Sequence, residues 1–296
     1  MTSASHNPRR AYFAWAVVCV VWGTTYLGIR IALETIPPLV MAAFRWIVAG
    51  SLLILVLKVR GERLPPPREY GSLAVLGFLL LGLGNGGVVW AEQTVPSGLT
   101  AVLVATAPFW MIGIDAVRHD GDPLVSRRVA GLLVGFGGIV LLVWPELRMG
   151  AAGRPFLGGV IAAQIACVGW AVGSSYARRR GHEENVLAAA AFEMLFGGLL
   201  LLAAGLARGE WAMLSFSPRS GGALAYLIFF GAIAGFSAYA YALKHLPVAV
   251  VSLYAYVNPV IAMVLGALVL GEPFGPRTVI AAAVVLVGMW LVRDEK

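Results

Sequence analysis

Stretches of roughly twenty apolar residues, separated by short loops, follow one another through almost the whole chain. A stretch of this length is long enough to cross a hydrocarbon layer of ~30 Å. Inside a bilayer the backbone polar groups have to pair within their own segment, so such stretches form helices. The pattern predicts an all-α integral membrane protein. We expect transmembrane helices over about 11–33, 37–59, 69–92, 98–117, 126–144, 155–178, 184–207, 219–242, 249–270 and 275–293.

The amino-acid composition agrees with this class and argues against others. Of 296 residues, 59% are hydrophobic and 12% are charged, whereas soluble domains carry roughly 25% charged residues. The net charge of +7 comes from Lys and Arg in short loops rather than from one basic face or tail, so no nucleic-acid partner is expected. Cys19 and Cys167 both lie inside apolar stretches, which indicates neither a disulfide framework nor a metal site. No cofactor is expected.

The distribution of Lys and Arg predicts the orientation of the chain. Fifteen of them fall in segments on the N-terminal side of the membrane and five in segments on the other side. Basic loops stay on the cytoplasmic side, so we expect a multi-pass protein with both termini in the cytoplasm. The apolar stretch after Arg9 and Arg10 is interpreted as the first helix rather than a signal peptide, because it is long and ends in no small-residue cleavage site.

An internal repeat divides the chain into two halves. Cys19 and Trp22 in the first half recur as Cys167 and Trp170 in the second. Three further pairs follow in the same order at a slightly longer spacing: Pro96 and Pro247, Pro108 and Pro259, and Gly121-Asp122-Pro123 and Gly271-Glu272-Pro273. We therefore expect one repeat over 1–148 (helices 1–5) and a second over 149–296 (helices 6–10). Because each repeat has an odd number of helices, the second lies inverted in the membrane, as in many secondary transporters.

These residues carry a resemblance to a known family. Trp22-Gly23, Arg45 and the long stretch from Val248 to Leu291 resemble the drug/metabolite transporter superfamily, EamA type, and the resemblance covers nearly the whole chain. By overall likeness the chain is most similar to the bacterial amino-acid exporters of the YddG type. The first repeat departs from the family pattern, because Gly121-Asp122-Pro123 stands where Gly-Glu is usual.

The resemblance implies a location, a fold and an activity. It implies the inner (cytoplasmic) membrane of the cell and a central cavity formed mainly by helices one, three, four, six, eight and nine. Helices five and ten are expected at the periphery. It also implies a small-molecule substrate, most of all an amino acid, and a lipid bilayer as surroundings, and it leaves open whether the chain forms a homo-oligomer.

Aromatic, amide and hydroxyl side chains in the middle of the predicted spans are the candidate substrate-binding residues. Cys19, Trp22 and Tyr26 share one face of the first helix, and Cys167, Trp170 and Ser174 share one face of the sixth. The alternative is that these groups fill gaps between helices or tie two helices together. The predicted cavity lining consists of Trp22, Tyr26, Asn85, Trp170, Ser174, Tyr239, Tyr254 and Asn258.

Charges and prolines inside the spans form a second group of candidates. Arg45 and Glu193 lie within helices two and seven, where a charge is costly and commonly functional. Each either meets a substrate charge or a proton, or anchors the structure; for Arg45 we favour the structural role. Pro108 and Pro259 remove a backbone hydrogen bond and are expected to kink their helices for gating.

An aromatic, mostly uncharged cavity favours export of aromatic and other apolar amino acids by alternating access. Export of other metabolites or of drugs fits the same fold. An anion or nucleotide-sugar exchanger would need several Lys or Arg in the cavity, and Arg45 alone is predicted to lie deep. An enzyme is not expected, because all four His lie in tails or loops and Glu193 has no companion carboxylate in its span.

Overall fold

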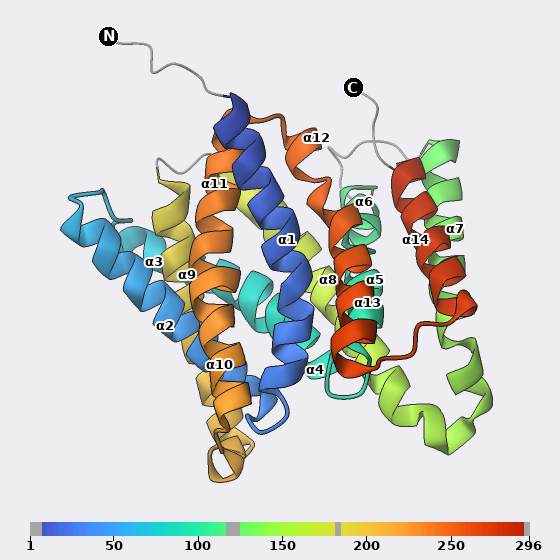
Figure 1. Ribbon diagram of the computed structural model, residues 1–296. Coiled ribbons are helices and arrows are strands. Elements are labelled where there is room, and N and C mark those ends of the chain that lie inside the picture. The colour runs from blue at the N-terminus through green and yellow to red at the C-terminus, as the bar shows by residue number, and fades with distance from the viewer. Residues whose placement is uncertain (1–7, 117–124, 181–184, 293–296) are drawn as a thin grey trace.

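The computed structural model describes residues 8–116, 125–180 and 185–292, and Figure 1 shows their arrangement. These residues form a bundle of membrane-length helices. The helices of the first half are α1 (Pro8–Ala32), α2 (Pro38–Val59), α3 (Tyr70–Leu76), α4 (Gly86–Ala91), α5 (Ser97–Val104), α6 (Ala107–Ala116) and α7 (Ser126–Arg148). Those of the second half are α8 (Arg154–Arg180), α9 (Val186–Ala207), α10 (Pro218–Tyr226), α11 (Gly235–His245), α12 (Val248–Val251), α13 (Tyr254–Leu270) and α14 (Pro276–Val292).

Several of these helices join end to end into one membrane span. The segments α3 and α4 are connected by the π-helical segment η2 (Gly77–Asn85), and α10 and α11 by the π-helical segment η5 (Leu227–Ala234). Short 3-10 turns complete the described structure: η1 (Pro67–Glu69), η3 (Gly150–Gly153) and η4 (Glu210–Met213). Within the described residues, eight spans are long and apolar enough to cross a membrane, and α13 and α14 are two shorter apolar helices. The all-α membrane fold expected from the sequence is confirmed.

The chain ends and the helix connections define the two ends of the bundle. Both described chain ends lie at the same end in Figure 1. The opposite end, called the distal end below, carries the connections 33–37, 92–96, 208–217 and 271–275. The Gly121-Asp122-Pro123 counterpart of the Gly271-Glu272-Pro273 connection lies outside the described residues.

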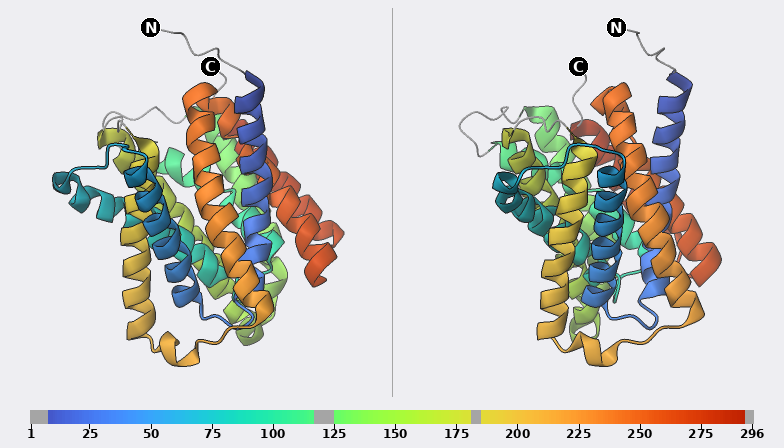
Figure 2. Two further views of the ribbon diagram at one scale, coloured as in Figure 1. Left: turned by 60° about the vertical axis from the view of Figure 1, so that its left-hand side comes forward. Right: turned by 90° about the vertical axis from the view of Figure 1, so that its left-hand side faces the viewer.

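Two pairs of helices pack through glycines at the two flanks of the bundle. The α2 and α9 helices run side by side (Figure 2), where Gly50 lies against the backbone of α9 and Gly198 against the backbone of α2. The α7 and α14 helices pair at the other flank (Figure 1), with Gly138 of α7 against Val285 and Gly288 of α14 against Gly135. Small residues let the helix backbones approach closely, which is how helices associate in a membrane.

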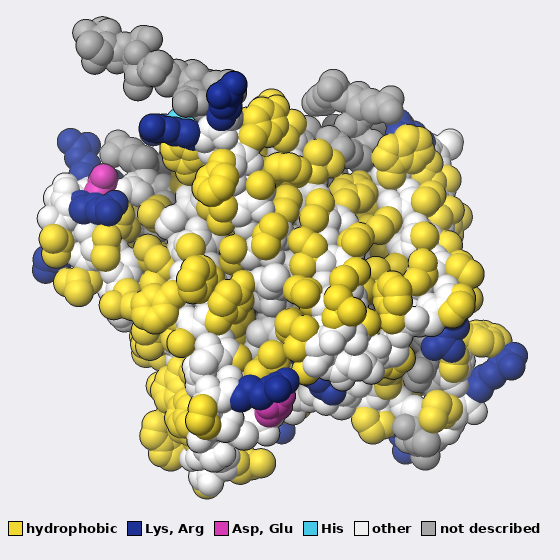
Figure 3. Space-filling model, viewed as in Figure 1, with side chains coloured by type: hydrophobic (Ala, Val, Ile, Leu, Met, Phe, Trp, Pro, Cys, Tyr) yellow, Lys and Arg dark blue, Asp and Glu magenta, His cyan; other side chains and the backbone are white. Residues whose placement is uncertain are grey.

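The surface of the bundle is apolar over its middle and basic at its ends. In Figure 3, hydrophobic side chains cover the face of the molecule at mid-height, and most Lys and Arg on this face lie toward its two ends. Exposed Leu133 and Leu268 belong to this apolar surface. Near the helix ends the guanidinium of Arg208 lies 4.7 Å from the ring centre of Trp90, and that of Arg148 lies 4.9 Å from Trp144. Such a surface suits a hydrocarbon layer bounded by two polar interfaces.

Candidate transport site

Four aromatic side chains meet about midway along α1, and we call them the aromatic cluster: Trp22, Phe236, Tyr239 and Tyr254. The ring centre of Trp22 lies 5.3 Å from that of Phe236, 5.1 Å from Tyr239 and 5.0 Å from Tyr254. The rings come from α1, α11 and α13, which pack together in the middle of the bundle. Three of the predicted cavity residues are therefore in contact. They form a wall suited to apolar and aromatic ligands.

The indole of Trp22 is held by the π-helical segment beside it. Its Nε1 donates a hydrogen bond of 3.2 Å to the carbonyl of Gly231 in η5. A Cβ atom on Gly235 would lie 2.5 Å from this same nitrogen, so the ring fits only because residue 235 is glycine. A π-helical turn carries one residue more than an α-helical turn and commonly marks a functional position. Here it provides both the acceptor and the space for the indole.

Trp170 occupies a matching position in the other half. A Cβ atom on Gly84 would lie 2.7 Å from Cδ1 and Nε1 of Trp170. Gly84 belongs to η2, just as Gly235 follows η5. Each of the two tryptophans predicted to line the cavity therefore packs on a glycine near the end of a π-helical segment.

The remaining predicted cavity residues lie in more ordinary settings. Tyr26 packs against the core between α1 and α2, and Ser174 is half-buried on α8. Asn85 is also half-buried, and its amide donates to the Leu80 carbonyl of its own segment at 3.4 Å. Asn258 is buried, and its side-chain nitrogen lies 3.0 Å from the carbonyls of both Cys19 and Tyr254. Its amide thus ties α13 to α1.

The two predicted kinks differ from a simple bend at proline. Pro108 lies in the first turn of α6, after a break at Ala105 and Thr106 that separates α5 from α6. Pro259 lies inside α13, and the break there falls at Ser252 and Leu253, before the helix begins. Each interruption precedes its proline: Pro108 fits the first turn of α6, whereas Pro259 lies in the interior of α13.

Side chains from α6 and α8 fill the break between α5 and α6. The Gln164 amide accepts a hydrogen bond of 2.9 Å from Nε1 of Trp110 and donates one of 3.4 Å to the Leu103 carbonyl. Thr106 donates to the same carbonyl at 2.6 Å, and the Cys167 thiol lies 3.6 Å from it. Backbone groups released by the break are thus paired inside the protein, as a membrane interior requires.

The two predicted intramembrane charges are placed differently. Arg45 is 3% exposed, its guanidinium lies 4.3 Å from the ring centre of Trp46, and its Nε has no hydrogen-bond partner among the described residues. Its end approaches Gly231 of η5. Glu193 is half-buried on α9, where the α9 backbone crosses η2 at Gly77.

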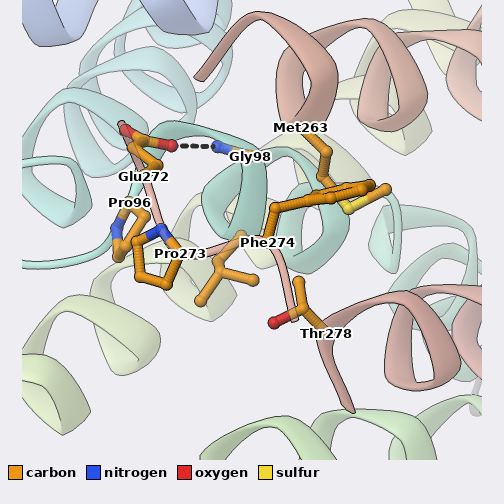
Figure 4. A pocket seen from close by; sticks show the side chains of 8 residues that line it. Pro96, Gly98, Met263, Glu272, Pro273, Phe274 and Thr278 are labelled. Carbon is orange, nitrogen blue, oxygen red and sulfur yellow. Dashed lines mark hydrogen bonds between the residues drawn. The ribbon is translucent and has the colours of Figure 1, made fainter. Parts of the chain in front are cut away.

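A carboxylate at the distal end clasps the start of α5, and we call this contact the Glu272 clasp (Figure 4). Oε1 of Glu272 accepts from the Ser97 amide at 2.8 Å, and Oε2 accepts from the Ser97 hydroxyl at 2.9 Å and the Gly98 amide at 3.2 Å. A carboxylate is favourable there because the first amides of a helix lack partners and carry partial positive charge. The clasp joins the α13–α14 connection to the start of α5. Glu210 holds the start of α2 in the same way, through the amides of Leu39 and Val40 at 2.9 and 3.1 Å.

A second distal carboxylate, Glu92, is buried completely. It follows the last residue of α4, just beyond the membrane span that ends at Ala91. Neither of its carboxyl oxygens has a hydrogen-bond partner in the described part of the chain. Burial raises the pKa of the Glu92 carboxyl well above its usual range; the charge of Glu272 acts in the same direction, and Arg30 and Arg45 oppose it.

The sequence analysis missed Glu92, Arg30 and Gln164. A signal was available for Glu92, because the connection after it is so short that two helix ends have to lie over it. Gln164 gave a weaker signal, since a lone amide inside an apolar span either binds a ligand or pairs with backbone.

The fold and the aromatic cluster together define a class: a polytopic helical membrane protein with aromatic side chains gathered about midway along its spans. Comparison with known proteins then gives the family. The chain matches the EamA-like transporter family over residues 9–144 and 157–293, and it belongs to that family. It is therefore a membrane transporter.

Individual relatives agree with this assignment. The chain is 38% identical to an Escherichia coli K12 protein described as uncharacterized inner membrane transporter YedA, over 92% of this chain and 87% of that protein. It is 25% identical to protein PecM of Dickeya dadantii, over 95% of this chain and 91% of the relative. A crystal structure with 20% sequence identity covers 97% of this chain and 98% of its own, with a TM-score of 0.65, which supports the fold. None of these names specifies an amino acid as substrate.

Proposed function

We propose that this transporter exports small metabolites, above all aromatic and other apolar amino acids, by alternating access. The observation that carries the proposal is the aromatic cluster, in which Trp22, Tyr239 and Tyr254 from three helices converge in the middle of the bundle. Rings supply contact area for an apolar side chain, and neighbouring hydroxyls and amides can pair with the amino and carboxylate groups. The proposed lining also includes Tyr26, Asn85, Trp170 and Ser174.

Two other predicted residues receive structural roles in this proposal. Asn258 ties α1 to α13 through the carbonyls of Cys19 and Tyr254. Arg45 anchors α2 to the core, because its guanidinium is buried and lies beside Gly231 of η5. The breaks near Pro108 and Pro259 provide the bends about which the two spans move, and Glu193 lies at the crossing of α9 and η2.

Alternating access requires two halves that can exchange conformations, and we assign these to the inverted repeats 1–148 and 149–296. Contacts at equivalent positions support the assignment. Trp22 packs on Gly235, and Trp170 packs on Gly84, so each half supplies the tryptophan to the other half's glycine. Gly50 and Gly198 stand at the same repeat spacing and both lie in the α2–α9 contact. Exchange of two such arrangements would open the site to one side and then to the other.

We further propose that the protein lies in the inner membrane with both termini in the cytoplasm, so that the distal end faces outward. The excess of basic residues on the side of the termini supports this orientation. The exposed Met213, at the distal end, tests it as Met213→Cys. Labelling by a membrane-impermeant maleimide in intact cells is expected, and protection until the cells are opened would reverse the orientation.

Replacement of the two symmetric tryptophans tests the site. Trp22→Ala and Trp170→Ala are each expected to lower phenylalanine efflux about tenfold or more, because an aromatic contact of ~1.4 kcal/mol corresponds to a factor of ten in affinity. Efflux from cells preloaded with labelled phenylalanine measures the rate, and membrane abundance is measured in parallel. Trp290→Ala is the matched control, because Trp290 is exposed near the end of α14. Unchanged efflux in both site variants would refute this lining.

A further inference from the structure

Glu92 lies in a position that is costly for a charge. It is 0% exposed, and neither carboxyl oxygen finds a donor among the described residues. A buried carboxylate needs hydrogen bonds or a paired cation to remain ionised, and without them it takes up a proton. The conformation seen here therefore holds Glu92 as a neutral acid. An unpartnered acid is an unusual residue to retain in a packed interior unless its charge is used.

The nearest cation does not form a pair with this carboxyl group. The Arg30 guanidinium, on α1, donates to the backbone carbonyl of Glu92. Tyr26 on α1 and Arg45 on α2 are the other titratable or charged groups that act on Glu92 from those helices, and Glu272 acts from the α13–α14 connection. Arg30 is thus close enough to pair with the Glu92 carboxylate once it is ionised. In this conformation Arg30 donates to the backbone carbonyl instead.

One further cation contacts α4, because the Arg208 guanidinium lies 4.7 Å from the ring centre of Trp90. On the α8 side, a groove of about 360 Å³ lies between the two helices, and the α8 residues that line it are Gly158, Ile161, Ala162 and Ile165. From α5 come Ser97 and Thr100, both fully buried; Ser97 is engaged by Glu272, and Thr100 donates to the Pro96 carbonyl. Loss of the Glu92 proton would therefore leave an anion whose closest negative neighbour is the carboxylate of the Glu272 clasp.

The proximity of Glu92 to the Glu272 clasp links protonation of Glu92 to the closure of the distal end. In the arrangement seen here, Glu272 holds the Ser97 and Gly98 amides. Once Glu92 is ionised, its carboxylate repels that of Glu272. The buried charge is also poorly solvated and is stabilised by water or by pairing with Arg30, so both effects oppose the packed arrangement. Hydration of Glu92 then requires that α5 and the α13–α14 connection separate.

We infer that the Glu92 carboxyl is a proton-binding site whose occupancy controls the opening of the distal end: the protonated form closes it and the ionised form opens it. The inference rests on the proposed function for its consequence in transport. With the distal end outward, a proton taken up from outside accompanies closure, and the proton gradient drives export when this proton is released to the cytoplasm before the distal end reopens. The closed form is most favoured at pH values below the pKa of Glu92 in the open form, and it loses stability as the pH rises toward the raised pKa of the closed form.

Hydrogen exchange at the first turn of α5 tests this inference without any substrate. The full-length protein in detergent is compared from mildly acidic to alkaline pH, with exchange corrected for its intrinsic pH dependence. In the unsubstituted protein, protection of the Ser97 and Gly98 amides is expected to fall by up to about tenfold per pH unit between the pKa of Glu92 in the open form and its raised pKa in the closed form. In Glu92→Gln, whose side chain stays neutral, protection is expected to remain high at every pH.

Two controls accompany the measurement. The first turn of α2, which Glu210 holds in the same way, is expected to keep constant protection in both proteins. Glu34→Gln removes an exposed distal carboxylate, which pairs with Arg219 at 3.1 Å, and is expected to behave like the unsubstituted protein. If Glu92→Gln does not fold, Glu92→Asp is expected to retain the pH response at a shifted midpoint.

Transport gives the second readout. Proteoliposome efflux of labelled phenylalanine is expected to respond to an imposed pH gradient in the unsubstituted protein and to lose that response in Glu92→Gln. An identical pH response of α5 exchange in the two proteins, or none in either, overturns the inference. If the exchange responds to Glu92 but phenylalanine is not transported, the proton site stands and the proposed substrate class fails.

Discussion

At the scale of single residues, the main result is the pairing of each central tryptophan with one glycine. Gly235 leaves space for the Trp22 indole, and Gly84 leaves space for Trp170. An indole close to backbone is held rigidly, so its ring presents a defined face to a ligand. This use of glycine is steric: it concerns close approach and not an unusual backbone angle, because neither residue has a positive φ.

Gly235→Ala tests this steric role. The added methyl group would lie 2.5 Å from Nε1 of Trp22, so the indole has to move away from the Gly231 carbonyl and its hydrogen bond is lost. We expect a loss of about 1–3 kcal/mol in stability and a lower transport rate, measured by thermal unfolding in detergent and by efflux. Gly222→Ala on the same span is the control, since nothing lies within 4 Å of its added methyl group. Equal behaviour of the two variants would contradict the role given to Gly235.

At the scale of helices, the interrupted spans are the distinctive elements. The span from α3 to α4 and the span from α10 to α11 each contain a π-helical segment, and α5 and α6 are separated by a break. Each interruption lies beside a residue of the candidate site. Backbone that is not regular is tolerated in a membrane where it is buried in protein and its polar groups are paired. At the α5–α6 break, Gln164 provides much of this pairing.

Gln164→Ala is expected to destabilise the break. It removes the acceptor of the Trp110 indole and a donor to the Leu103 carbonyl, and a buried polar group without its partner costs about 1–3 kcal/mol. Thermal unfolding is expected to shift downward by the corresponding amount. Gln93→Ala is the control, because Gln93 is exposed and donates within its own turn. A Gln164→Ala protein as stable as this control would show that the break is held by other contacts.

The helices and the site differ in how far the sequence predicts them. Segment length and apolar character alone predict the spans to within a few residues, because the bilayer sets that length. The π-helical segments do not follow from composition, because the close packing of Gly84 on Trp170 is a tertiary contact.

Burial of a side chain by distant segments is the other property that local sequence does not predict. Glu92 stands one residue past an apolar stretch, where a side chain usually reaches solvent, but it is fully buried and Arg30 of α1 donates to its backbone carbonyl. Trp22, Tyr239 and Tyr254 were predicted as separate lining residues, and their mutual contact depends on how α1, α11 and α13 pack. Sequence therefore indicated the kinds of residues at the site better than their partners.

At the scale of the whole molecule, the protein combines a membrane bundle, an aromatic cluster and, at the distal end, the buried Glu92 together with the Glu272 clasp. The family assignment makes the protein a membrane transporter, and the arrangement of the bundle supports two halves that exchange roles. The apolar character of the central site is what selects the proposed substrates. Arg45, the deep cation, is covered by Trp46, which leaves an anionic substrate without a free partner there.

Counterflow in proteoliposomes tests the proposed activity most directly. Vesicles that contain the purified protein are loaded with unlabelled phenylalanine, diluted into a trace of labelled phenylalanine, and followed over time; leucine and glutamate are run in the same way. We predict transient accumulation of label with phenylalanine and leucine and none with glutamate. No accumulation with any amino acid, from protein shown to be folded, would contradict the proposed substrate class.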